Sequence, residues 1–213
     1  MQSTSDEPGL LARWRSWLDE KPDDWHRNLW DEFYALLHRR EMWRRYQRLV
    51  RDAPEEAHQS VGFFHQWVMR NYLETQTIAI RRFTYTGRDA QPASLGRILV
   101  EVRDNPSVLG AVADGASEDI LKLDAATAMI RTFVNTQVAH LDTDHGARFE
   151  DFSFADMDEV VDVIGEVWVR WYPSITGKGA SAEPAAPLLW ENAFTVSWTT
   201  REDLRARAQR GDL

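Results

Sequence analysis

Apolar side chains recur at helical spacing along nearly the whole chain, and prolines, glycines and capping residues interrupt the pattern at intervals. Alternating apolar and polar residues, which are typical of strands, occur only over residues 194–198. The 213 residues, 43% of them hydrophobic, suffice for one ordinary core and are few for two. We therefore predict an all-α protein, with a helical bundle over residues 1–178 and an extended tail over residues 179–213.

Start and stop signals divide the bundle into helical segments. An N-terminal helix within residues 1–22 carries an apolar face and ends before Pro22, because proline disfavours helical backbone in the preceding residue. The main bundle covers residues 23–178. Its expected helix starts are Ser94, Ser117, and Ser153 with Asp156 as a capping box. Its predicted helices span residues 25–53 (one helix or two in series), 60–83, 95–103, 117–141 and 154–176.

Ten tryptophans stand in the chain, and most of them recur at helical spacing beside leucine, phenylalanine and valine. Tryptophan rings can form ligand cages or stack on nucleic-acid bases, but helical spacing among aliphatic residues is typical of a core. We therefore assign nearly all of them to the core of the bundle. The residues expected to anchor the tail on its surface are Trp190, Phe194 and Trp198.

The formal net charge of −9 repels polyanions, so any nucleic acid would have to bind a local basic surface. One such surface is a basic stripe within about 140° around a helix, made by Arg40, Arg44, Arg45, Arg48 and Arg51. Two interpretations stay open. Either the stripe pairs with acidic side chains of neighbouring helices or remains solvated, or it contacts RNA or an acidic partner through Arg40, Arg44 and Arg48.

Several classes of protein are disfavoured by what the sequence lacks. No apolar run approaches the roughly 20 residues that span a bilayer, and the N-terminus lacks a signal-peptide pattern, so we expect a cytoplasmic protein without membrane contact. The absence of cysteine excludes disulfides and thiolate metal sites. Phosphate-loop, dinucleotide-binding and hydrolase-elbow patterns do not occur, so we predict no cofactor.

One polar motif, at the end of the predicted helix 117–141, suggests chemistry rather than packing. Its polar residues are Arg131, Asn135, His140 and Asp142. Together with Asp144 and His145, the last two could ligate a metal ion. Loops rich in aspartate, threonine and histidine commonly follow helices without metal, however, so we predict no metal site.

Three stretches of the chain together suggest a family. Asn135 to Asp142 combines a helix end with a histidine, and an Asp-rich loop and a further helix follow it. Ile80-Arg81-Arg82 precedes a second stretch, Ala93 to Leu99, and Leu189 to Trp198 forms an aromatic ending. In these short motifs, spread over residues 25–200, the chain resembles the HEPN superfamily (higher eukaryotes and prokaryotes nucleotide-binding domain), particularly its abortive-infection U-type branch.

The resemblance implies an up-and-down helical bundle, frequently dimeric, in a phage-defence or toxin–antitoxin system. Family members with an arginine, a polar residue and a histidine in this motif act as metal-independent ribonucleases. His140 would then serve as general acid or base at the ribose hydroxyl, and Asn135 would orient it or the RNA. An arginine would stabilise charge on the phosphate. The implied partners are RNA, an antitoxin protein and a second copy of the chain.

The arginine of this pattern is missing, because Val134 occupies the position before Asn135. Arg131 shares a helix face with Asn135, about 40° away. On a regular helix, however, it lies about 180° from His140. Arg131 and His140 therefore cannot converge within one straight helix.

Two functions stay open. One is a metal-independent ribonuclease with a degenerate motif. In that case another arginine replaces the missing side chain. It is either Arg131, brought in by an unwound helix end, or an arginine from elsewhere, such as Arg81, Arg82 or one from a second subunit. The other is a non-catalytic helical interaction and dimerisation module that keeps the fold and has lost the activity.

Overall fold

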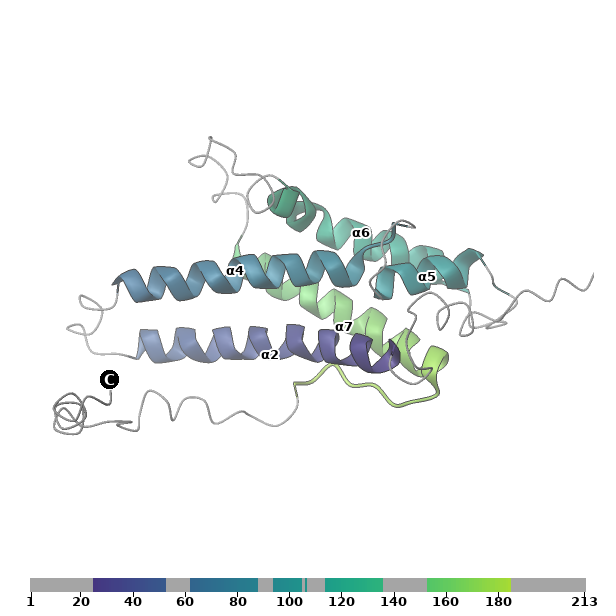
Figure 1. The fold of residues 1–213 in the computed structure, drawn as a ribbon, viewed down its shortest axis with the longest axis horizontal. Coiled ribbons are helices and arrows are strands. Elements are labelled where there is room, and N and C mark those ends of the chain that lie inside the picture. The colour runs from purple at the N-terminus through teal and green to yellow at the C-terminus, as the bar shows by residue number, and fades with distance from the viewer. Residues whose placement is uncertain are drawn as a thin grey trace, which may run out of the picture. The chain divides into compact units, whose positions relative to one another are not determined.

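The computed structural model describes residues 25–52, 62–87, 94–104, 106, 114–135 and 153–184. These residues form five α-helices and contain no strand, which confirms the predicted all-α class. In chain order the helices are α2 (Trp25–Arg51), α4 (Gly62–Thr84), α5 (Leu95–Asp104), α6 (Ala116–Phe133) and α7 (Phe154–Thr176). Helix α4 contacts each of the other four, and α7 also contacts α2 and α6, so the helices form a bundle (Figure 1).

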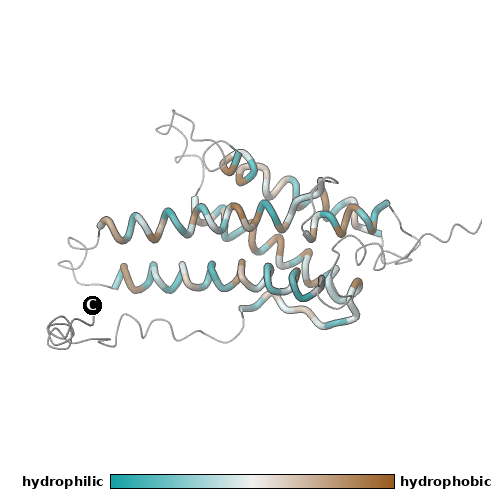
Figure 2. Tube along the Cα trace, in the orientation of Figure 1, coloured by the Kyte–Doolittle hydropathy of each residue, from teal (hydrophilic) through white to brown (hydrophobic). Residues whose placement is uncertain are grey.

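The first two described helices are long. Residues 25–51 form one continuous helix of 27 residues, so the single helix is the correct one of the two predicted arrangements. Helix α4 begins at Gly62 and ends at Thr84, within two residues of the predicted span. Hydrophobic and hydrophilic residues are interleaved along the helices, as Figure 2 shows. The hydrophobic residues that face neighbouring helices form the core.

Aromatic rings from three helices fill the core between α2, α4 and α7. The Trp168 indole is 1% exposed and stacks on Phe33, at a centroid distance of 4.6 Å, and on Tyr172, at 4.2 Å. Phe83 of α4 joins the cluster at 5.9 Å from Trp168. Such offset and tilted ring pairs stabilise a core beyond the burial of their area. The core prediction is confirmed for Trp43, Trp168 and Trp171.

The core prediction is wrong for Trp67, which is 54% exposed, and the neighbouring Phe63 and Phe64 are 84% and 43% exposed. The reason is rotational. Trp67 precedes the fully buried Gln76 by nine residues, which places the two side chains about 180° apart around α4. Gln76 faces α2, where it donates to the Leu36 carbonyl, so Trp67 lies on the outer face. We call Phe63, Phe64 and Trp67 the aromatic surface.

Helix α5 is joined closely to the end of α4. As predicted, Ser94 caps it, because its hydroxyl accepts a hydrogen bond from the backbone N–H of Arg97 at 3.0 Å. The same hydroxyl donates to the carbonyl of Tyr85 at 2.6 Å. A Cβ on Gly96 would overlap the carbonyl of Thr84. The close approach of these two helix ends therefore requires glycine at residue 96.

Helix α6 begins one residue before Ser117, the predicted start. Gly115 bounds the helix with a left-handed φ of 96°, and its carbonyl accepts from the N–H of Asp119 at 2.9 Å, so the Ser117 hydroxyl is not the cap. One side of the helix lines the core, and its buried residues there include Ile120, Leu123, Thr127, Ile130 and Val134. The α-helix ends at Phe133, and the predicted continuation beyond residue 135 lies outside the described residues.

The capping box predicted for α7 is present. The Ser153 hydroxyl accepts from the backbone N–H of Asp156 at 3.1 Å, and the Asp156 carboxylate accepts from the N–H of Ser153 at 2.7 Å. The helix runs through Pro173 and ends at Gly177, which has a left-handed φ of 70° and donates to the Pro173 carbonyl at 2.8 Å. Local cap chemistry thus sets both ends of this helix.

The segment after α7 packs back on that helix, because a Cβ on Gly165 would lie only 3.1 Å from the methyl of Ala182. By its contacts the chain divides into two compact units, residues 1–183 and 184–213. The predicted N-terminal helix within residues 1–22 lies outside the described residues. Outside them too are the predicted tail anchors Trp190, Phe194 and Trp198.

Candidate functional site

The end of α6 carries the described part of the polar motif. Val134, at the position where the HEPN resemblance would expect an arginine, is 3% exposed and lies in the core. Asn135 beside it is exposed, and the backbone widens into a π-type turn at these two residues. The other motif residues, His140 and Asp142, lie outside the described residues.

Arg131 is held by its own helix. Its Nη1 forms an ion pair with the Asp124 carboxylate, and its Nη2 donates to the Asp124 carbonyl at 2.9 Å. Both side chains are 38% exposed, so this ion pair lies at the surface. The guanidinium is therefore bound seven residues before its own position, toward the start of α6.

The two arginines in the last turn of α4 lie elsewhere in the bundle. Arg82 forms an ion pair with Glu32 of α2, and Arg81 is partly exposed. Arg131 is bound by Asp124 on α6. The described contacts therefore do not bring Arg82 and Arg131 together.

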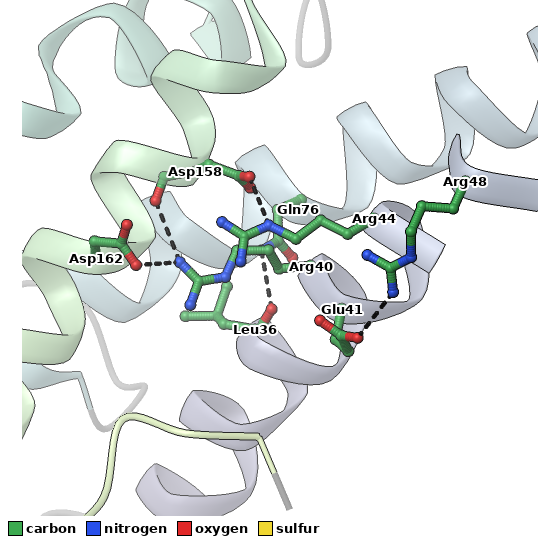
Figure 3. Close-up of polar contacts among 8 residues, drawn as sticks. All are labelled: Leu36, Arg40, Glu41, Arg44, Arg48, Gln76, Asp158 and Asp162. Carbon is green, nitrogen blue, oxygen red and sulfur yellow. Dashed lines mark hydrogen bonds and ion pairs between the residues drawn. The ribbon is translucent and has the colours of Figure 1, made fainter. Parts of the chain in front are cut away.

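One end of the basic stripe faces α7 (Figure 3). Arg40 is 7% exposed, and its Nη1 donates to the Asp158 carbonyl at 3.3 Å and pairs with the Asp162 carboxylate. Arg44, one turn later, pairs through Nε with the Asp158 carboxylate at 2.8 Å. These contacts join α2 to α7 across a partly buried seam.

The other end of the stripe pairs within α2. Glu41 accepts from Nε of Arg45 at 2.7 Å. It also accepts from Nη2 of Arg48 at 3.5 Å (Figure 3). The hydrogen bond from Arg45, with the positive charges of both arginines, lowers the pKa of Glu41 below its ordinary value. Arg40, Arg44, Arg45 and Arg48 thus all have carboxylate partners on this chain. The first interpretation of the stripe, pairing with a neighbouring helix, holds for Arg40 and Arg44, whereas the other two pair within α2.

A buried polar layer continues from the seam into the contact between α2 and α4. The side chain of Gln76 accepts from Nε of Arg39 at 2.9 Å and donates to the Leu36 carbonyl at 3.0 Å. Burial lowers the pKa of Arg39 and raises the pKa of Tyr72, and the Asp158 carboxylate raises the pKa of Tyr72 further. The Tyr72 phenol therefore stays protonated at neutral pH and cannot act as a base there.

Sequence reasoning missed Asp158 and Asp162 as the partners of the stripe. A signal is present, because the two carboxylates are four residues apart on one helix face, which is also the spacing of Arg40 and Arg44. Matching pairs of opposite charge on two amphipathic helices indicate a seam between them. The four-residue spacing alone does not show which of the other helices carries the carboxylates that pair with the arginines.

A groove of about 470 Å³ lies between α2 and α4. Three of the nine residues that line it are apolar, and charges of both signs stand around it. The apolar residues are Ala35, Ile78 and Ala79. The polar residues are Asn28, Asp31, Glu32, Arg39, Thr75 and Arg82. A partner with both apolar and charged groups would therefore fit this groove better than a simple anion would.

Comparison with known proteins adds no family to these observations. No protein-family model matches the chain, and no curated protein or solved structure matches it. Within the described ranges, no group of three or more histidine, aspartate or glutamate side chains could hold a metal ion. None of the described helices is long and apolar enough to cross a membrane. Function is therefore inferred from the geometry of the chain's own residues.

Proposed function

We propose that the chain is a helical interaction and dimerisation module of a HEPN-like defence or toxin–antitoxin system, without ribonuclease activity. The observation that carries the proposal is the aromatic surface of α4, where Phe63 and Trp67 are 84% and 54% exposed. The rings of Phe64 and Trp67 stack with their centroids 6.0 Å apart, so the aromatic area is contiguous. Contiguous exposed aromatic area is typical of a surface that binds another protein.

The end of α6 supports the non-catalytic form of the proposal. A ribonuclease of this type needs a guanidinium beside the phosphate, where it stabilises the charge of the transition state. The motif position for that group holds the buried Val134, and Arg131 is bound to Asp124. Arg40 and Arg44 of the basic stripe are bound to α7.

A second copy of the chain is the partner to test first. We expect the double substitution Phe63→Ser and Trp67→Ser to raise the dissociation constant of the dimer at least about tenfold, because exposed aromatic anchors contribute most to interfaces. Both side chains point away from the core, so the substitutions leave the bundle folded. Sedimentation velocity over a concentration series measures the dissociation constant.

Leu121→Ser is the matched control, because Leu121 is a 69% exposed apolar residue on a different helix, α6. It should leave the dissociation constant unchanged. A wild-type protein that stays monomeric over the series would contradict dimerisation. Equal association of the wild type and the double variant would contradict the aromatic surface as the interface.

A metal-independent ribonuclease is the second candidate, and one observation favours it. Asn135 is exposed at a π-type turn, and such turns are frequent at functional sites. In this candidate His140 acts as general acid or base, Asn135 orients it or the RNA, and an arginine such as Arg81 contacts the phosphate.

Incubation with total RNA in EDTA separates the two candidates. For the interaction module, we expect the wild-type protein and the His140→Ala variant to leave the RNA equally intact on a denaturing gel. The ribonuclease requires cleavage that persists in EDTA and disappears in the variant, because imidazole would carry the proton transfer. That result would overturn the non-catalytic proposal.

A further inference from the structure

The groove between α2 and α4 lies along the N-terminal half of α2. Its α2 lining extends from Asn28 to Arg39, and α4 contributes residues 75–82. Within it Ile78 is 42% exposed, so its apolar side chain is accessible to a ligand in the groove. The exposed Asp31 stands on the same lining. The groove thus offers an apolar contact beside an acidic group.

An apolar face suited to this groove occurs in the sequence just before α2. Its five residues fall within about 120° around a helix and are Leu10, Leu11, Trp14, Trp17 and Leu18. Arg13 and Arg15 flank the two edges of the face, each about 40° outside it. The segment lies outside the described residues, so this pattern is a property of the sequence. It predicts an amphipathic helix with a basic border.

The connection to α2 has the right length and composition for a chain reversal. Residues 19–24 separate Leu18 from the first residue of α2, and Pro22 among them disfavours one continuous helix. After a reversal, residues 10–18 run antiparallel to α2. Nine helical residues extend about 13.5 Å, and the twelve residues of α2 along the groove extend about 18 Å.

We propose that residues 10–18 form an amphipathic helix that docks in the groove between α2 and α4, with its apolar face against Ile78 and Ala79. Arg13 and Arg15 at the border of the face can then approach Asp31, an exposed carboxylate of the lining. The docked helix also covers Arg82, so this predicted RNA-binding residue is then not accessible to RNA.

Amide hydrogen exchange, followed by mass spectrometry on the full chain, tests the docking. We expect the amides of residues 10–18 to exchange at least about tenfold more slowly than in a peptide of the same sequence. Ile78→Glu should remove this protection, because it places a carboxylate on the apolar contact. The Ile78 side chain is partly exposed, so the variant keeps its helices, and circular dichroism verifies this.

Leu121→Glu is the matched control, since it makes the same kind of change at an exposed apolar residue of α6. Protection should persist in it. Protection that survives in Ile78→Glu would overturn the docking, as would a segment that exchanges at the peptide rate in the wild type. Protection that increases with protein concentration would place the segment on a second copy and would overturn the intramolecular docking as well.

Discussion

Replacing Trp168 by alanine should lower the free energy of unfolding by about 3–5 kcal/mol, the range for removing a large aromatic side chain from a core. The indole is 1% exposed, and it contacts rings of three helices, from Phe33, Phe83 and Tyr172. Those rings are themselves buried and closely packed, so they cannot move far enough to fill the space that the indole leaves. The cavity adds to the lost burial.

Urea denaturation followed by circular dichroism measures the loss. Trp67→Ala is the matched control, because it is the same substitution at an indole that is 54% exposed. At protein concentrations below the dissociation constant of the proposed dimer, we expect that control to change the free energy of unfolding by less than about 1 kcal/mol. Equal losses in the two variants would contradict the assignment of Trp168 to the centre of the core.

Helix ends are predictable from sequence where a side chain forms a local cap. The Ser94 cap and the Ser153 and Asp156 capping box depend on residues three apart, and both are confirmed. The start of α6 is different, because Gly115 bounds the helix through its backbone conformation. Ser117 is followed by two acidic residues, a composition that is equally typical of a cap and of a residue inside the first turn of a helix. Composition therefore cannot separate the two.

Burial is predictable where helical periodicity continues through contacts with neighbours, as along α6 and α7. The same reasoning gives the wrong answer for Phe63 and Trp67, which are exposed although their residue types are typical of a core. Phe63 and Trp67 are exposed because α2 and the other helices cover the opposite face of α4, the face that carries the buried Gln76. The covered face depends on contacts between helices, and the local pattern of one helix does not contain that information.

The stripe of arginines on α2 can be read from the sequence, but the partners of these arginines cannot. The pattern of arginines on α2 allows both RNA binding and intramolecular pairing, because both need the same exposed cations. Pairing depends on Asp158, which is 114 residues away from Arg44 along the chain. Only the packing of α2 on α7 brings these two side chains together. The histidine of the polar motif, His140, remains a prediction.

Placing an arginine at residue 134, where the proposed HEPN likeness expects one, should destabilise this protein rather than create a ribonuclease. Val134 is 3% exposed at the end of α6, so an arginine there has to bury a guanidinium or displace the helix end. Overpacking alone costs about 1–3 kcal/mol, and a buried charge adds to that cost. We therefore expect Val134→Arg to lower the free energy of unfolding by about 3 kcal/mol or more.

Asn135→Arg is the matched control, since the adjacent side chain is exposed and the substitution should change stability by less than about 0.5 kcal/mol. Urea denaturation compares the two variants, and total RNA in EDTA reports their activity. A Val134→Arg protein that is as stable as the wild type and cleaves RNA would place residue 134 at a substrate surface and overturn the non-catalytic proposal. A loss of stability with intact RNA has the opposite meaning: valine at residue 134 is then required by the packing of α6, and a single substitution cannot complete the motif.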